Sequence, residues 1–140
     1  MAAQGKNILC IDTDRNGLTL RGALLQDHGY RVLTATCGRE GLQLFVSQAV
    51  DAILLDYYLT LLDGGVVADE IKRLKPETRV VMLTDHREVP QDGLKSVDAF
   101  VFKSHGPEAL LAALHAVLEA NSGSKTAGAD FRAGGKASIA

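Results

Sequence analysis

Several residue types are scarce in this sequence, and each shortage excludes a class of protein. The chain of 140 residues contains no tryptophan and two cysteines, and its formal net charge is −2. Two cysteines are too few for a disulfide framework or a zinc knuckle, and a nearly neutral chain has no basic field to attract nucleic acid. No apolar run reaches the ~18 residues of a membrane span, and the first residues, MAAQGKN, lack the apolar stretch of a secretory signal. We therefore expect a cytoplasmic protein with no direct nucleic-acid or membrane partner.

The residues that are present suit one globular domain. Apolar residues make up 46% of the chain and charged residues 23%, which is typical of soluble folded proteins. The composition changes abruptly near the end, where NSGSKTAGADFRAGGKASIA is rich in Gly, Ala, Ser and Lys and shows no periodicity. We predict a folded domain over residues 1–120 and a flexible tail or linker remnant over residues 121–140.

Apolar strands alternate with helical patterns along the domain. The runs predict five strands, at residues 7–11, 30–35, 51–56, 79–84 and 99–102. Apolar residues at helical spacing fill the gaps, except that the fourth gap is short and contains Pro90 and Gly93, so we predict a shortened fourth helix there. Strands with continuous apolar runs, separated by helices, indicate an α/β fold: a doubly wound parallel sheet with helices on both faces.

Five polar residues stand where apolar strands end. Asp12 and Asp14 follow the first strand, Asp56 ends the third, Thr84 ends the fourth and Lys103 follows the fifth. The carboxyl ends of parallel strands share one edge of the sheet, so these residues should gather there. Taken singly, Asp14 fits a helix N-cap equally well, whereas a carboxylate at Asp56 follows a strongly apolar strand, where it would be costly unless paired.

The pattern ILCIDTD…ILLDYYLTLLDG…VVMLTD…AFVFKS resembles the receiver domain of response regulators in two-component signalling, over residues 6 to about 120. The resemblance implies a flavodoxin-like, chemotaxis-regulator-like fold with strand order 2-1-3-4-5. It also implies that Asp56 accepts a phosphoryl group from a histidine kinase or phosphotransfer protein. Thr84 and Lys103 would contact that group, and Thr84 and Phe100 would form the conformational switch.

The same resemblance implies a Mg²⁺ cofactor held by Asp12, by Asp56 and by the backbone carbonyl of Tyr58. The second acid of the family's metal-binding pair falls on Thr13, which has no charge. One unit charge at ~4 Å is worth about 1 kcal/mol in water and roughly 4 kcal/mol at an intermediate dielectric, so Mg²⁺ binding should weaken. Either Thr13 or Asp14 remains a candidate further ligand.

Three functional interpretations follow from these residues. The first is a phospho-accepting receiver that signals by contact with a downstream protein, with a homodimer as a further candidate partner and no enzymatic turnover beyond assisting its own phosphorylation and dephosphorylation. The second is a pseudo-receiver that keeps the fold and binds a partner without phosphorylation. The third is a haloacid-dehalogenase-type phosphatase with Asp12 as nucleophile and Asp14 as acid–base, which would leave Asp56 without a role.

Overall fold

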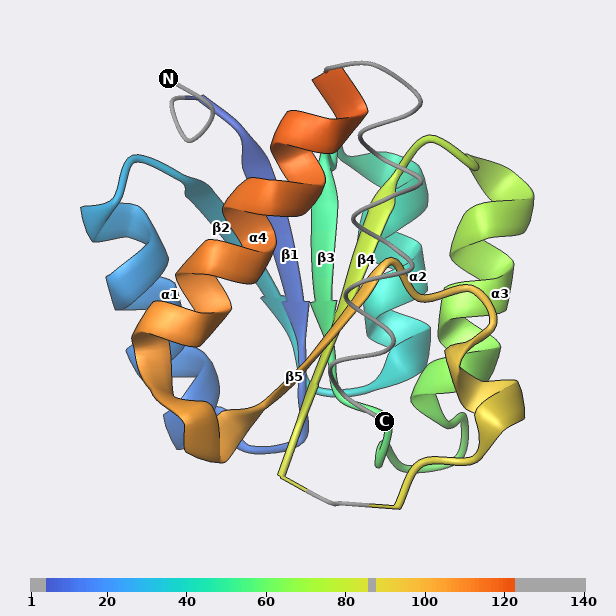
Figure 1. The fold of residues 1–140 in the computed structure, drawn as a ribbon. Coiled ribbons are helices and arrows are strands. Elements are labelled where there is room, and N and C mark those ends of the chain that lie inside the picture. The colour runs from blue at the N-terminus through green and yellow to red at the C-terminus, as the bar shows by residue number, and fades with distance from the viewer. Residues whose placement is uncertain (1–4, 86–87, 123–140) are drawn as a thin grey trace.

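Residues 5–85 and 88–122 are described by the computed structural model, and they form a parallel sheet covered by helices on both faces (Figure 1). The predicted tail lies outside these residues from position 123 onward. The sheet order is β2-β1-β3-β4-β5, and every neighbouring pair is parallel, which confirms the predicted topology. The strands are β1 (Asn7–Ile11), β2 (Arg31–Ala35), β3 (Ala52–Leu55), β4 (Arg79–Thr84) and β5 (Ala99–Phe102).

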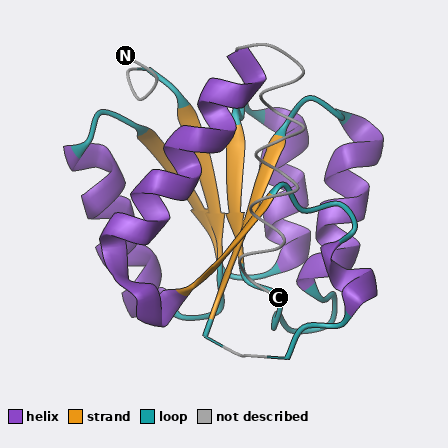
Figure 2. Cartoon of the chain, in the orientation of Figure 1, coloured by secondary structure: helices purple, strands orange, loops and turns teal. Residues whose placement is uncertain are grey.

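The helices divide between the two faces of the sheet (Figure 2). The described part of the chain contains four α-helices: α1 (Arg15–Asp27), α2 (Gly38–Ser47), α3 (Gly64–Leu74) and α4 (Gly106–Ser122). The last ends two residues beyond the predicted domain boundary. Apolar residues of α1 and α4 share one buried cluster with the sheet, while those of α2 and α3 share the other. Within the described residues, none of these helices is both long and apolar enough to cross a membrane.

Each strand contributes side chains to both clusters because successive side chains point to opposite faces of the sheet. In β1, Ile8 and Cys10 pack toward α1 and α4, whereas Leu9 and Ile11 pack toward α2 and α3. All four are at most 1% exposed. A central strand that is covered on both faces therefore needs a continuous apolar run. Such runs are visible in the sequence, and this is why the strands could be predicted from it.

Short side chains set the starts of two helices. Asp14 precedes α1, and its Oδ1 accepts a hydrogen bond from the Gly17 amide at 3.1 Å. Asp63 precedes α3 in the same way, accepting from the Val66 amide at 2.9 Å. Such caps satisfy amide groups that have no partner within the helix. The capping role weighed for Asp14 is therefore observed.

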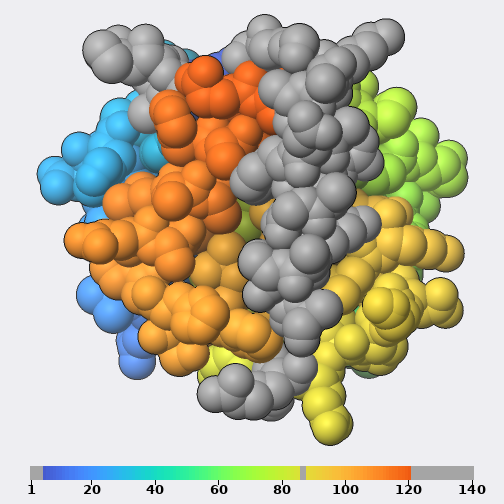
Figure 3. Space-filling view, viewed as in Figure 1, coloured from blue at the N-terminus to red at the C-terminus, as the bar shows by residue number. Residues whose placement is uncertain are grey.

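The segment between β4 and β5 departs furthest from an ordinary βαβ unit. Over residues 88–98 it contains one 3₁₀ helix, η1 (Gln91–Leu94), where a shortened helix was predicted. Pro90 directly precedes it and lacks an amide donor, and Gly93 lies so close to Tyr57 that a Cβ on Gly93 would be 2.7 Å from the ring. On the face shown in Figure 3 the segment reaches the surface at the lower right, away from α4.

A buried cluster of charged side chains lies at the amino edge of the sheet, where the strands begin. Asp98 is 2% exposed, and its carboxylate accepts from Lys72 Nζ at 2.6 Å, from Arg79 Nη1 at 3.3 Å and from the Val80 amide at 2.8 Å. These partners belong to α3 and β4, so one carboxylate ties the turn before β5 to both elements. Removing a single member would leave buried charges without compensation.

We predict that Asp98→Ala lowers the free energy of unfolding by about 3–5 kcal/mol, because Lys72 and Arg79 lose their shared partner. Urea denaturation followed by circular dichroism measures this. The matched control is Glu70→Ala, which breaks an ion pair with Arg73 on the outside of α3 and should change stability little. Equal effects of the two substitutions would contradict the structural role of Asp98.

Candidate functional site

The polar residues at the strand ends lie together at the carboxyl edge of the sheet. Asp12 follows β1, Asp56 follows β3 and Thr84 ends β4, and these three strands are neighbours in the sheet. All three residues are buried, with exposures of 3%, 5% and 0%. The Asp56 amide donates to the Ile11 carbonyl at 3.1 Å, so the ends of β3 and β1 are joined beside the two carboxylates.

Lys103 bridges the two carboxylates. It is the first residue of the 3₁₀ helix η2 (Lys103–His105) after β5, and its Nζ lies 2.6 Å from Asp12 Oδ2 and 3.0 Å from Asp56 Oδ2. Burial by itself lowers the pKa of this ammonium, but the hydrogen bonds to Asp12 and Asp56 outweigh burial and raise the pKa above its ordinary value. Lys103 is therefore positively charged at neutral pH.

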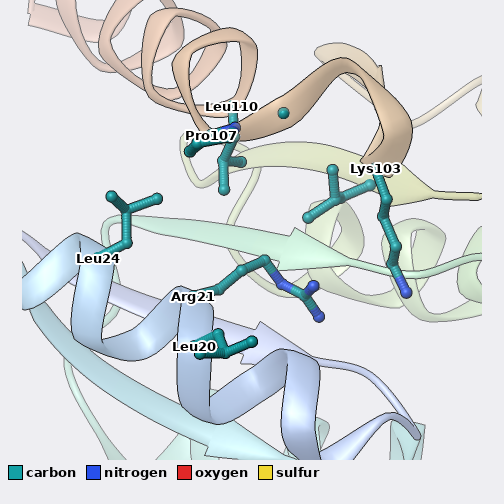
Figure 4. Close-up of a pocket in the computed structure, with 8 residues that line it drawn as sticks. Leu20, Arg21, Leu24, Lys103, Pro107 and Leu110 are labelled. Atoms are coloured by element: carbon teal, nitrogen blue, oxygen red, sulfur yellow. The ribbon is translucent and has the colours of Figure 1, made fainter.

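Arg21 belongs to the same cluster, although sequence reasoning did not predict it. Its Nη2 lies 2.6 Å from Asp12 Oδ2, and its side chain is 16% exposed. The signal was available: Arg21 follows Leu18 by three residues and precedes Leu25 by four, so it lies on the buried face of α1. Figure 4 shows the side chains of Arg21 and Lys103 reaching toward the same region from α1 and from the end of β5.

The oxygens of both carboxylates already have partners. Asp12 Oδ2 contacts Arg21 and Lys103, while its Oδ1 accepts from the Asp14 amide at 2.9 Å. Asp56 Oδ2 contacts Lys103, while its Oδ1 accepts from the Tyr58 amide at 3.0 Å. The two acids are thus held in place by cations and by backbone amides, with each oxygen engaged.

The side chains considered as further ligands of the predicted divalent cation lie at the surface. Thr13 is exposed, and Asp14 is exposed and caps α1. Within residues 5–85 and 88–122, no group of three or more acidic, histidine or cysteine side chains is arranged to hold a metal ion. Mg²⁺ needs several oxygen ligands in near-octahedral geometry, and the two buried carboxylates here contact nitrogen donors. Metal binding by Asp12, Asp56 and the Tyr58 carbonyl therefore stays a prediction.

The predicted switch residues lie in the neighbouring strands β4 and β5. Thr84 is fully buried at the end of β4. Phe100 in β5 is 7% exposed and packs with the cluster formed by α2 and α3. Its ring contacts that of Phe102 edge-on, with centroids 5.1 Å apart. Both residues are thus buried in the fold, while their switching role stays a prediction.

Comparison with known proteins identifies the family of this fold and site. Residues 8–115 match the family model of the response regulator receiver domain. The chain belongs to the response-regulator receiver family. Members of this family are signalling modules rather than enzymes with turnover, so the family assignment favours the receiver over the phosphatase interpretation.

Curated relatives are longer regulators. The chain is 31% identical over 122 residues to the transcriptional regulatory protein GlrR of Escherichia coli K12, covering 85% of this chain but 28% of GlrR. It is also 31% identical over 115 residues to a probable transcriptional regulator, ycf27, of Cyanidium caldarium, covering 80% of this chain and 46% of that protein. The chain therefore spans less than half the length of these two relatives.

Solved structures share the fold. The response regulator TrrA of Thermotoga maritima, solved in complex with Mg²⁺ and BeF, has a TM-score of 0.74 and 31% identity, over 78% of this chain and 96% of TrrA. TrrA has also been solved in complex with the histidine kinase ThkA, and that structure matches with a TM-score of 0.71. These complexes are properties of TrrA.

A glycine at the start of α3 keeps Asp56 in position. The Gly64 amide donates to the Tyr57 carbonyl at 2.7 Å, and a Cβ on Gly64 would lie 2.4 Å from the Asp56 carbonyl oxygen and 2.6 Å from Tyr57 Cα. These obstacles are backbone atoms, which cannot move aside as a flexible side chain can. A residue with a side chain at position 64 would push the acceptor loop out of place.

We predict that Gly64→Ala destabilises the protein by about 1–3 kcal/mol through this overpacking and shifts the amide resonances of Asp56 and Tyr57. Gly22→Ala is the matched control, because it lies within α1 and its Cβ would meet Val32 Cγ1 at an ordinary 3.6 Å. That substitution should stabilise by roughly 0.5–1 kcal/mol, since alanine favours helix. Thermal unfolding distinguishes the two, and a neutral Gly64→Ala would contradict the predicted clash.

Proposed function

We propose that this chain accepts a phosphoryl group on Asp56 from a histidine kinase or a phosphotransfer protein and signals through contact with another protein. The observation that carries the proposal is the placement of the Asp56 carboxylate, 5% exposed at the end of β3, with Lys103 Nζ 3.0 Å away. A buried carboxylate beside a charged ammonium and next to the end of β4 is suited to receive a group that brings further negative charge.

The transfer itself requires little of the protein beyond position and charge. A carboxylate oxygen of Asp56 attacks the phosphorus of a phosphohistidine, the phosphorus–nitrogen bond breaks, and the departing imidazole takes a proton from water. Negative charge spreads over the phosphoryl oxygens in the transition state. Lys103 supplies a compensating positive charge, and the Thr84 hydroxyl at the end of β4 supplies a donor for the bound phosphoryl group.

The output is a change in protein contacts at the β4–β5 side of the sheet. When Thr84 turns toward the phosphoryl group, the space beside it changes for Phe100, which packs under α2 and α3. The complex of TrrA with its kinase supports a histidine kinase as the upstream partner, and the similarity to transcriptional regulators supports a protein target downstream. A homodimer remains a further proposed partner.

A second function, that of a phosphorylation-independent interaction module, is favoured by one observation. Asp12 and Asp56 are already neutralised by Arg21 and Lys103 in the absence of a phosphoryl group. A site whose charges are balanced internally can be a permanent structural element. The surface around it would then bind a partner in one constant conformation.

Intact-mass spectrometry after incubation with acetyl phosphate at high Mg²⁺ concentration separates the two functions. We predict that the wild type gains one phosphoryl group and that Asp56→Asn gains none, because the amide is not a nucleophile. The matched control is Asp92→Asn, an exposed acid in η1, which should keep the gain.

The proposed function fails if the folded wild type gains no phosphoryl group, and the interaction module then becomes the better account. A gain that persists in Asp56→Asn would instead show that another residue is the acceptor. Folding of each variant is checked by circular dichroism, so that a lost gain reflects chemistry and not unfolding.

A further inference from the structure

Arg21 occupies a place in the site that the proposed function leaves unexplained. Its guanidinium is directed at Asp12, the acid that the family resemblance assigns to the metal. We propose that Arg21 is a built-in counter-ion at the cation position of this site, so that a divalent cation binds only after Arg21 has been displaced from Asp12. The inference rests on the proposed function in taking Asp12 and Asp56 as the receiver site.

The space for the guanidinium is shaped by the start of α1. A Cβ on Gly17 would lie 2.9 Å from Arg21 Nη1 and 2.7 Å from Asp14 Oδ2. The missing side chain at Gly17 leaves room for the guanidinium beside the acidic loop. Leu18 and Leu25 are buried on either side of Arg21 along the helix, so packing of α1 against the sheet directs this side chain inward. The ion pair is therefore built into the fold.

The charges of the site balance without a metal. With an acid at position 13, the set of Asp12, residue 13, Asp56 and Lys103 would carry a charge of −2, which matches the charge of Mg²⁺. Thr13 reduces this to −1, and the guanidinium of Arg21 reduces it to zero. A neutral cluster attracts a divalent cation far less than one with two net negative charges.

The guanidinium cannot release Asp12 by losing its proton, since arginine stays charged throughout the working pH range of proteins. Release requires the side chain to move. A groove of about 350 Å³ between α1 and α4 adjoins Arg21 and offers that space (Figure 4). Its walls are mainly apolar: Leu20, Leu24, Leu83, Pro107 and Leu110. Leaving Asp12 for an apolar groove is unfavourable, so the resting position of Arg21 is on the carboxylate.

The test is a titration with MgCl₂ in the absence of any phosphodonor. Binding is measured from the shifts of the backbone amide resonances of residues 12–14, 56–58 and 103. We expect Arg21→Gln to bind Mg²⁺ at least about tenfold more tightly than the wild type, because Asp12 loses a competing cation. The matched control is Arg31→Gln, an exposed arginine at the start of β2 on the opposite edge of the sheet. It removes the same charge from the chain and should change the affinity less than about twofold, since exposed distant charges are screened.

Two further variants separate charge from space. Arg21→Lys keeps a positive charge and should keep the weak binding of the wild type, whereas Arg21→Gln combined with Thr13→Asp should bind more tightly than Arg21→Gln alone. Arg21→Met, which keeps an unbranched stem, replaces Arg21→Gln if the latter does not fold.

Equal Mg²⁺ affinities of the wild type and the folded Arg21→Gln or Arg21→Met variant would overturn the proposal. So would an equal gain in Arg31→Gln, which would reveal a general effect of net charge. Because no phosphodonor is present, this result is independent of whether Asp56 accepts a phosphoryl group. Failure of the counter-ion and failure of the phosphoryl acceptor are therefore distinguishable.

Discussion

Two buried carboxylates at the carboxyl edge of the sheet place a constraint on the rest of the structure. Asp12 and Asp56 lose most of their hydration when β1 and β3 pair, and their charge must be compensated from elsewhere in the chain. Lys103 reaches them from the end of β5, and Arg21 reaches Asp12 from α1. The site is therefore complete only when the last strand and the first helix have both docked, so its electrostatics depend on the whole fold.

The opposite edge of the sheet shows that such a cluster does not by itself indicate function. Asp98 also pairs with two cations, Lys72 and Arg79, and those side chains are 20% and 17% exposed, much like Lys103 at 18% and Arg21 at 16%. The cations are thus buried to a similar degree at both edges, although the amino edge has one acid and the carboxyl edge has two. What differs is position, because ligands of doubly wound sheets bind at the carboxyl ends of strands near the reversal of strand order. In the order β2-β1-β3-β4-β5 the reversal falls between β1 and β3, the two strands that are followed by Asp12 and Asp56.

Most of the fold could be predicted because its signals are local. β1, β4 and β5 begin and end where the apolar runs do, and parallel strands without polar alternation required helices on both faces. The gathering of Asp12, Asp56, Thr84 and Lys103 followed from topology, since each residue stands at the end of a strand. The conformation between β4 and β5 was harder to predict, because the contact of Gly93 with Tyr57 joins segments distant in sequence.

Arg21 was missed for a different reason, and it shows what a pattern of apolar residues conceals. The apolar residues of α1 at helical spacing include Leu18, Leu20, Leu24 and Leu25, yet Leu20 is 72% exposed while Arg21 is largely buried. The stripe that actually faces the sheet runs through Leu18, Arg21, Gly22 and Leu25. A charged residue within such a stripe requires a buried partner of opposite sign, and the nearest strand end offered Asp12.

Thr13 and Arg21 then become parts of one arrangement. The absence of an acid at position 13 and the presence of a cation from α1 affect the charge of the site in the same direction. Either change alone would leave the buried cluster charged, and together they bring it to neutrality. Both proposed functions use this neutral state. They differ in whether an incoming phosphoryl group competes with Asp12 for Arg21 and Lys103 strongly enough to rearrange the ion pairs. A ligand shifts such an equilibrium only if it binds the rearranged state more tightly than the resting state.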